Sequence, residues 1–158
     1  MKHGVHIRPY TPADLEACLA VFDTNVPRYF ISKEREEFRA FLENPPGPYL
    51  VLEDEQGVIV GCGGHALGDE PGRADLCWGM VRQEKHRRGL GRRLIHARID
   101  AAKADPAVRV IALNTSQLTT GFYERFGFRV TSTEPDGYGP GLDRCEMRLE
   151  LERPSPSA

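Results

Sequence analysis

Apolar positions recur at helical spacing in two stretches near the start of the chain. The first opens at Thr11–Asp14, whose threonine, proline and aspartate suit the start of a helix, and keeps one apolar face as far as Phe22. The second opens at Ser32, carries its acidic residues early, and is stopped by the proline pair that begins at Pro45. The pattern therefore predicts two consecutive helices after a short strand over residues 5–8.

Strand-like patterns follow these helices. The apolar runs 49–53 and 58–67 flank the turn-forming residues 54–57, which is a hairpin signature. Glycines at positions 61, 63 and 64 interrupt the second run and indicate a bulge, or a close approach by another backbone or a ligand. Further strands are predicted over residues 74–81, 108–113, 128–133 and 144–151.

A basic segment with two glycines connects the strand over residues 74–81 to a helix predicted over residues 90–104. Gly89 and Gly91 stand among lysine, histidine and arginine residues between Lys85 and Arg93. Each arginine in the first turn of a helix is unfavourable by roughly 0.3–1 kcal/mol, because the N-terminus already carries partial positive charge. That penalty reverses when an anion binds, and successive backbone N–H groups at a helix start form an anion site. The segment therefore predicts a site for a phosphate-bearing ligand.

The complete order of predicted elements is βααβββαβαββ. It includes a short helix over residues 116–126, with Gly127 in position to cap its end, and a glycine-rich loop over residues 135–143. This order predicts a mixed α/β fold: a central mixed, mostly antiparallel and twisted sheet of about seven strands, with helices on both faces. We expect one domain over residues 1–152 and a disordered tail over residues 153–158.

Composition narrows the class of protein. The chain has 158 residues, 28% of them charged, and a formal net charge of -2, so the basic segment is a local feature and a nucleic-acid partner is not expected. The apolar runs are too short to cross a bilayer, and the first residues lack the apolar stretch of a secretion signal, so no membrane contact is expected. The scattered cysteines lack metal-ligand spacing, which argues against a metal site and is typical of a protein of the reducing cytoplasm.

Two common nucleotide-binding motifs do not fit the basic segment. A Walker loop needs Gly-x-x-x-x-Gly-Lys followed by Ser or Thr, and the chain contains no such run. A dinucleotide fingerprint needs a small residue where Leu94 stands, and an acid at the end of the next strand, where Asn114 stands. A different phosphate-bearing ligand is therefore indicated.

Three segments resemble the GNAT superfamily of N-acetyltransferases, in the order that this family has them. His86-Arg87-Arg88-Gly89-Leu90-Gly91 is similar to the family's acetyl-coenzyme A loop, Gln/Arg-x-x-Gly-x-Gly/Ala, with histidine where glutamine or arginine is usual. Residues 7–14 resemble the common opening of the family, and Asn114 with the run 121–128 resembles its second cofactor segment. The resemblance covers about residues 4–151.

The resemblance implies an acetyl-CoA-dependent N-acetyltransferase that moves the acetyl group directly to a primary amine within a ternary complex. The backbone amides of residues 87–92 are then expected to hold the cofactor pyrophosphate, and the end of the preceding strand to pair with the pantetheine arm. The residues implied in binding acetyl-CoA are Met80, Val81, Arg82, His86, Arg87, Arg88, Gly89, Leu90, Gly91, Arg92 and Asn114. No metal cofactor is implied.

The resemblance also implies two catalytic residues. Tyr123 matches the tyrosine that lies near the thioester sulfur in many relatives. A phenol has a pKa of about 10, so it stays protonated at neutral pH and can donate its proton to a leaving thiolate. Asp75 resembles in position the glutamate base of some histone-type relatives, with His65 and Glu70 as rivals. The ordinary structural readings are a core aromatic for Tyr123 and a turn-capping residue for Asp75.

The sequence identifies neither the amine acceptor nor the oligomeric state. Tyr29, Phe30 and Tyr138 are candidates for lining an acceptor pocket, and the amine belongs to either a small molecule or a peptide. A homodimer, common in the family, is compatible with an exposed edge strand. The alternatives are a non-catalytic acyl-CoA-binding sensor on the same fold and, less favoured, a nucleic-acid-binding domain that uses residues 85–93.

Overall fold

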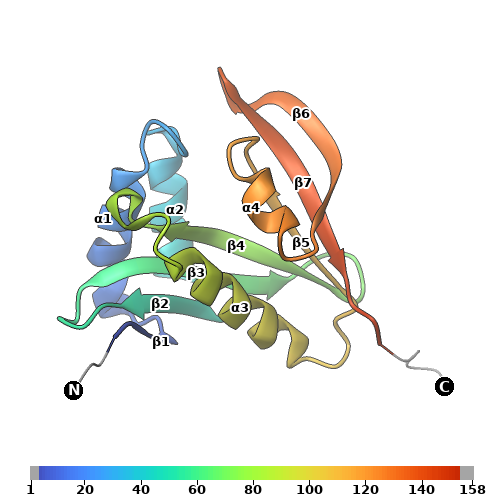
Figure 1. The fold of residues 1–158 in the computed structure, drawn as a ribbon, viewed down its shortest axis with the longest axis horizontal. Helices are drawn as coiled ribbons and strands as arrows, with labels where there is room; N and C mark the ends of the chain where they lie inside the picture. The colour runs from blue at the N-terminus through green and yellow to red at the C-terminus, as the bar shows by residue number, and fades with distance from the viewer. Residues whose placement is uncertain (1–3, 154–158) are drawn as a thin grey trace.

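The computed structural model describes residues 4–153. Its centre is a seven-stranded sheet with the strand order β1-β2-β3-β4-β5-β7-β6 and with helices on both faces (Figure 1). Neighbouring strands are antiparallel except β4 and β5, which are parallel. The predicted fold class, a mixed and mostly antiparallel sheet, is confirmed. The tail predicted to be disordered, residues 153–158, lies outside the described residues apart from Arg153.

The order of elements along the chain is the predicted one. The strands are β1 (His6–Pro9), β2 (Tyr49–Glu53), β3 (Ile59–Leu67), β4 (Arg73–Val81), β5 (Val110–Thr115), β6 (Arg129–Gly139) and β7 (Leu142–Glu150). The helices are α1 (Leu15–Thr24), α2 (Glu34–Glu43), α3 (Leu90–Lys103) and α4 (Thr120–Glu124), with the short 3-10 turns η1 (Pro12–Asp14) and η2 (Gln83–Lys85).

The connection between the last two strands differs most from the prediction. Residues 135–143, predicted as a loop, instead extend β6 to Gly139 and form a tight hairpin with β7. Asp136 closes this hairpin, because its amide donates to the Asp143 carboxylate (3.0 Å) and its own carboxylate accepts from the Gly141 amide (2.9 Å). The prediction was wrong because these bonds cross between strands, and a high glycine content does not reveal them.

Two hydrophobic cores lie on opposite faces of the sheet. One joins α1 and α2 to β2, β3 and the end of β4, and it contains Phe22 and Phe38. The other joins α3 to the start of β4, β5 and β7, and it contains Ile95, Ile111 and Met147. The apolar faces predicted for these helices are therefore the faces that pack on the sheet.

A β-bulge in β4 reverses the alternation of its side chains between the two faces of the sheet. Ala74 and Leu76 belong to the core beneath α3, whereas Trp78 and Met80 pack in the core beneath α1 and α2. The register with β3 shifts at this point, and Trp78 has a φ of +43°, which is uncommon for a bulky residue. The glycines of β3 that predicted a bulge therefore mark one that is shared with β4.

β4 and β5 pair over a short parallel stretch and then separate. The last paired positions are Asp75 and Ala112; beyond them β4 keeps its partner β3, and β5 keeps its partner β7. Figure 1 shows the two strands running apart from this point, with α3 and α4 on the near side. Beyond this point no strand of residues 4–153 pairs with the inner edge of β4, which opens the sheet at its centre.

Candidate active site

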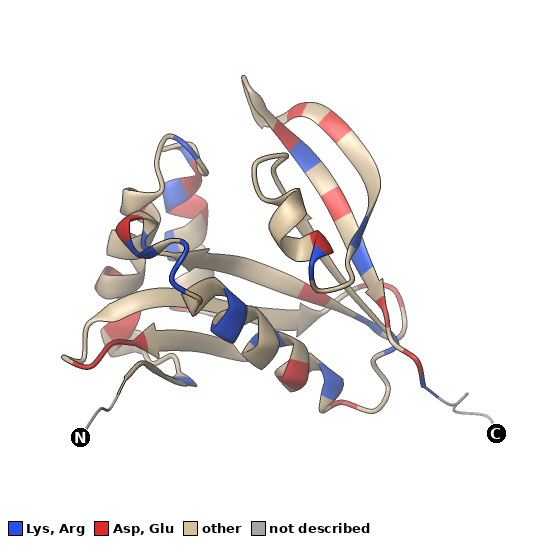
Figure 2. Ribbon diagram, in the orientation of Figure 1, with Lys and Arg blue, Asp and Glu red and all other residues tan. Residues whose placement is uncertain are grey.

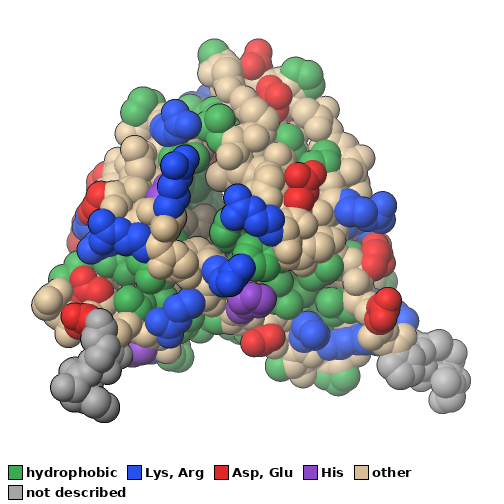
Figure 3. All heavy atoms as spheres, in the orientation of Figure 1, with side chains coloured by type: hydrophobic (Ala, Val, Ile, Leu, Met, Phe, Trp, Pro, Cys, Tyr) green, Lys and Arg blue, Asp and Glu red, His purple; other side chains and the backbone are tan. Residues whose placement is uncertain are grey.

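A cleft of about 760 Å³ lies where β4 and β5 separate. It extends from the start of α3 to the connection between α1 and α2, with β4 on one side and β5 and α4 on the other. In Figure 3, Lys and Arg side chains gather around the hollow that opens on the face carrying α3. The volume is within the usual range of small-ligand pockets, roughly 300–1,000 Å³.

The loop between β4 and α3 presents free backbone amides at one end of this cleft. Arg87 and Gly89 both have left-handed backbone, with φ of +68° and +80°, and they turn the chain into the helix. Among the described residues, the amides of residues 87–92 donate to no other group. Gly91 allows α4 to come close, because a Cβ at this position would lie 3.2 Å from the Phe122 ring. The geometry is that of an anion-binding helix start.

The cations around this loop lack acidic partners among the residues that the structure describes. Arg87, Arg92 and Arg125 line the cleft, and none of them forms an ion pair with a carboxylate of residues 4–153. Figure 2 shows Lys and Arg following one another along the loop that leads into α3. Free amides beside unpaired guanidinium groups favour a ligand that carries several negative charges.

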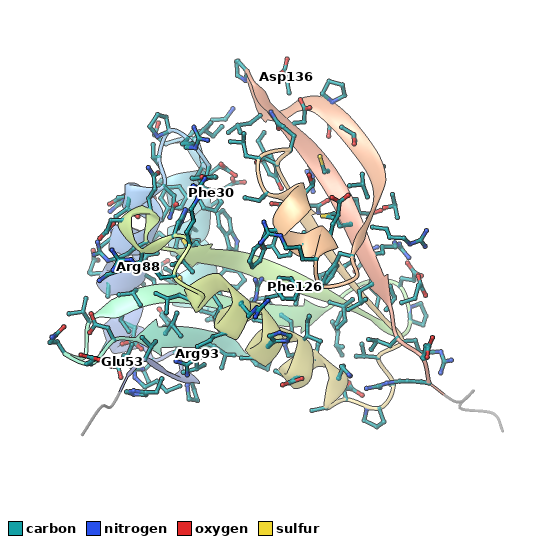
Figure 4. All side chains as sticks on the ribbon, viewed as in Figure 1. Phe30, Glu53, Arg88, Arg93, Phe126 and Asp136 are labelled. Carbon is teal, nitrogen blue, oxygen red and sulfur yellow. The ribbon has the colours of Figure 1, made fainter. Side chains whose placement is uncertain are left out.

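Most residues predicted to bind acetyl-CoA lie on the cleft. Those that line it are Met80, Val81, His86, Arg87, Gly89, Gly91, Arg92 and Asn114. Arg82, Arg88 and Leu90 are not among its lining residues. The Arg82 amide donates to the Val60 carbonyl (2.8 Å) and its guanidinium to Glu84 (3.2 Å), which turns the residue toward β3. Arg88 is exposed on the loop (Figure 4).

His86 ties the loop to the end of β4. Its Nε2 lies 2.8 Å from the Val81 carbonyl oxygen, which also accepts a hydrogen bond from Asn25 Nδ2 at 3.0 Å. The imidazole packs edge-on against Tyr29, with ring centroids 5.3 Å apart. The histidine that stands in place of the usual glutamine or arginine therefore fixes the loop against α1 and its connection, and it leaves Nδ1 as the ring nitrogen available to a ligand.

Aromatic side chains form the other end of the cleft. Trp78 stacks on Phe38 with ring centroids 4.9 Å apart, and its ring centroid lies 6.1 Å from that of Phe30. Phe30, labelled in Figure 4, comes from the connection between α1 and α2. Tyr29 and Tyr138 also line the cleft. The residues suggested for an acceptor pocket therefore share one cavity with the loop between β4 and α3.

Tyr123 and Asp75 both line the cleft but differ in their contacts. Tyr123 lies on α4, and its hydroxyl has no hydrogen-bond partner in the described part of the chain. The Asp75 carboxylate accepts a hydrogen bond of 2.6 Å from Arg73 Nε. The rivals His65 and Glu70 are not among the residues that line the cleft.

Two buried charged residues that the sequence reasoning did not single out also line the cleft. Glu34 opens α2 and Arg98 lies within α3, with 8% and 3% of their surface exposed. Burial raises the pKa of the Glu34 carboxyl, and the hydrogen bond from the Ile31 amide (3.0 Å) acts in the opposite direction. Residues four apart share one face of a helix. Glu34 stands four residues before the apolar Phe38 and Arg98 stands four residues after Leu94, so this spacing could have indicated that both are buried.

A family model matches most of the chain. The model of the acetyltransferase (GNAT) domain matches residues 13–151. The chain belongs to the GNAT acetyltransferases. The resemblance carried by the basic glycine loop is thereby confirmed, and the protein is an N-acetyltransferase by family.

Solved structures of other proteins share the fold of this GNAT acetyltransferase. The ribosomal-protein-S18-alanine N-acetyltransferase of Escherichia coli has a TM-score of 0.80 at 18% identity, covering 98% of each chain. A GCN5-related N-acetyltransferase of Kribbella flavida has a TM-score of 0.76 at 23% identity, covering 94% of this chain and 98% of its own. The protein yncA of Salmonella typhimurium, solved with its cofactor acetyl-CoA, has a TM-score of 0.73 at 22% identity, covering 97% of each chain. No curated protein sequence matches the chain significantly.

Three further features of this GNAT acetyltransferase concern membrane-spanning helices, metal ligands and cysteines. Across residues 4–153, no helix has the length and apolar character needed to span a membrane. The same residues contain no group of three or more His, Cys, Asp or Glu side chains arranged to hold a metal ion. Cys18, Cys62, Cys77 and Cys145 are free thiols.

Proposed function

We propose that this acetyltransferase moves an acetyl group from acetyl-CoA to a primary amine by direct attack in a ternary complex. The observation that carries the proposal is one continuous cleft, which joins the free loop amides at the start of α3 to the aromatic residues near α1 and α2. Two ligands that enter from opposite faces of the sheet would meet where β4 bulges. A direct transfer therefore needs no covalent intermediate on the protein.

The loop end of the cleft suits the phosphates of coenzyme A. The amides of residues 87–92 can donate to the pyrophosphate, and Arg87, Arg92 and Arg125 supply positive charge around it. The inner edge of β4 has no partner strand beyond Asp75 within residues 4–153, so it offers backbone groups to the amides of the pantetheine arm, as an added strand would use them. Met80 and Val81 stand on that edge.

Tyr123 is the proposed acid. The amine nitrogen attacks the thioester carbonyl carbon, the C–S bond breaks, and the sulfur takes a proton from the Tyr123 hydroxyl and leaves as the thiol. Tyr123 suits this role because it lines the cleft and its hydroxyl makes no other hydrogen bond within residues 4–153. The tyrosine then recovers a proton from solvent.

Two carboxylates in the cleft are candidates for the base that receives the proton of the amine. Asp75, expected from the sequence, is held by Arg73 and stands where β4 and β5 still pair, at the closed end of the cleft. Glu34 lies at the aromatic end, and burial raises its pKa, so it accepts a proton more readily than an exposed glutamate does. We therefore propose Glu34 as the base, with Asp75 as the alternative.

The aromatic end of the cleft selects the acceptor. A protonated amine is attracted by aromatic faces and by a carboxylate, and Phe30, Trp78 and Tyr138 line this end together with Glu34. Peptide N-termini and small amines with an apolar substituent both meet these requirements.

Two measurements test the proposal. Titration calorimetry is expected to show that acetyl-CoA and coenzyme A both bind, and absence of binding at high micromolar ligand would overturn the function. A screen of small amines and peptide N-termini, followed by release of free thiol, is expected to identify the acceptor class. Replacing Gly89 and Gly91 together by valine should abolish binding in the first measurement, because the loop can no longer approach the phosphates.

A further inference from the structure

Arg98 extends from α3 toward the sheet and is almost completely buried. Its guanidinium occupies space that two glycines leave free on the face of β3 and β4 beneath α3. A Cβ built on Gly79 would lie 2.0 Å from Arg98 Nη1, and one built on Gly63 would lie 2.8 Å from Arg98 Nε. The glycines of the bulge therefore have a second consequence: they admit an arginine side chain between α3 and the inner edge of β4.

The charge of Arg98 has no acidic partner in the described part of the chain. Nε and Nη2 donate to the Gly64 carbonyl at 3.4 Å, and Nη2 also donates to the Cys77 carbonyl at 3.3 Å. Within residues 4–153, no carboxylate forms an ion pair with Arg98, and Nη1 donates to no group. His65 does not offset the charge, because burial and the Arg98 cation both lower its pKa. A buried cation is strongly unfavourable unless negative charge or hydrogen bonds compensate it, so we expect a ligand atom here that accepts from Nη1 and either carries or gains negative charge.

The position of Arg98 identifies which ligand atom can supply this charge. Arg98 lines the cleft together with Trp78 and Gly79 of the bulge. It lies on the face that carries α3 and the phosphate-binding loop, whereas Phe30 packs in the core on the opposite face. Arg98 therefore faces the cofactor side of the cleft rather than the acceptor side. An acetyl group carries no charge of its own, and the one atom of it that becomes negative during transfer is the thioester oxygen.

We propose that Arg98 Nη1 donates a hydrogen bond to the thioester oxygen and stabilises it as an oxyanion, an inference that rests on the function proposed above. When the amine nitrogen adds to the carbonyl carbon, the π electrons of the C=O bond move to the oxygen, which Nη1 contacts. When the C–S bond breaks, the electron pair returns to re-form the carbonyl, and the sulfur takes the proton of Tyr123. A preorganised donor in a water-poor site of this kind contributes strongly to acyl transfer.

The decisive experiment needs no acceptor. Acetyl-CoA labelled with a heavy isotope at the acetyl carbonyl is bound to the protein, and the carbonyl stretch is recorded by infrared difference spectroscopy. Arg98 polarises the carbonyl, so the stretch of the bound molecule is expected to shift to lower wavenumber than that of free acetyl-CoA. In Arg98→Met this shift is lost, while calorimetry gives a similar affinity. With an identified acceptor, turnover of Arg98→Met falls by roughly 10²–10³-fold at similar KM for acetyl-CoA.

Two further variants separate this role from a structural one. Gly63→Ala keeps the charge but displaces the guanidinium, because the three atoms nearest to its new methyl group all belong to Arg98 and Gly63 does not line the cleft. It should reduce the carbonyl shift, and it provides the test if Arg98→Met fails to fold. Lys103→Met removes an exposed cation from the end of the same helix and should leave the shift and the turnover unchanged.

The possible results distinguish a failure of the proposed function from a failure of the role of Arg98 alone. If calorimetry shows that the protein binds no acetyl-CoA, the proposed function and this inference both fail. If acetyl-CoA binds with an unshifted carbonyl, or with a shift that survives in Arg98→Met, only the role of Arg98 is overturned. If succinyl-CoA binds more tightly than acetyl-CoA and Arg98→Met removes that preference, the guanidinium is a receptor for an acyl carboxylate, which also overturns the oxyanion role.

Discussion

The buried Tyr49 hydroxyl donates a hydrogen bond of 2.7 Å to the Trp78 carbonyl. This bond runs from β2 across β3 to the bulge of β4, at the residue whose φ is +43°. Strained backbone persists only where surrounding contacts hold it. The Tyr49 hydroxyl is one such contact, and burial raises its pKa well above the ordinary value, so it remains a donor at any physiological pH.

Tyr49→Phe is therefore expected to weaken both the fold and the site. Leaving a buried carbonyl without its donor lowers the free energy of unfolding by about 1–3 kcal/mol. Relaxation of the bulge misplaces the reacting groups and lowers turnover by up to roughly 10²-fold. Denaturant unfolding and steady-state kinetics measure the two effects. Tyr10→Phe is the control, because its hydroxyl donates to the Leu42 carbonyl (3.0 Å) away from the bulge; a comparable loss of turnover in this variant would contradict the argument.

Features that depend on neighbouring residues were predictable from the sequence. The turn between β2 and β3 forms because Gly57 adopts a φ of +80° and the Asp54 carboxylate accepts hydrogen bonds of 2.9 Å from the amides of Gln56 and Val58. The loop before α3 forms in a similar local way, through the left-handed backbone of Gly89. Sequence patterns encode such interactions directly, since all the participating groups lie within a few residues of each other.

Features that depend on distant segments were not predictable. The carbonyl partners of Arg98 come from β3 and β4, 34 and 21 residues away along the chain. The Arg82 amide donates to the Val60 carbonyl, a partner on the neighbouring strand β3 that lies far from Arg82 in the sequence. The cleft itself exists because β5 stops pairing with β4 after Asp75, and no local pattern marks that position. The sequence therefore predicted the loop that begins the cleft but not the buried Glu34 and Arg98 that also line it.

A comparison with Gly57 separates the effect of Gly89 on acetyl-CoA binding from its effect on the free energy of unfolding. Both have a φ of +80° and open space where a side chain would be, so Gly89→Ala and Gly57→Ala should each lower the free energy of unfolding by about 1–2 kcal/mol. Only Gly89→Ala is expected to weaken acetyl-CoA binding, because only its loop carries the free amides. Calorimetry on both variants measures this difference. Equal affinities would show that the loop conformation does not hold the cofactor.

Tyr123→Phe tests the proposed acid. Removal of the hydroxyl should lower turnover by roughly 10²–10⁴-fold, since the thiolate then leaves without a proton donor. The affinity for acetyl-CoA should change little, because the aromatic ring keeps its edge-on contact with Phe122. Turnover is measured by thiol release and affinity by calorimetry. Unchanged turnover would assign Tyr123 to the core alone.

Glu34→Gln should lower activity and, at neutral pH, raise stability. Burial raises the folded-state pKa of this carboxyl above its ordinary value of 4.5, so the folded state binds the proton more tightly than the unfolded chain does. The stabilising contribution of the protonated group is therefore fully present below the unfolded pKa and is lost as the pH rises through the folded pKa. Glutamine stays neutral and can still accept the hydrogen bond from the Ile31 amide, so the variant keeps this stabilising contribution at neutral pH.

The free energy of unfolding of Glu34→Gln relative to the wild type is accordingly expected to increase as the pH is raised from 4 toward 7, as measured by denaturant unfolding at several pH values. Turnover should fall by roughly 10²-fold or more if Glu34 takes the proton of the amine. Glu37→Gln removes an exposed carboxyl from the same helix and controls for the change in net charge. Asp75→Asn distinguishes the two bases: if it abolishes turnover while Glu34→Gln retains it, the base is Asp75, because a carboxylate that accepts the proton cannot be replaced by an amide.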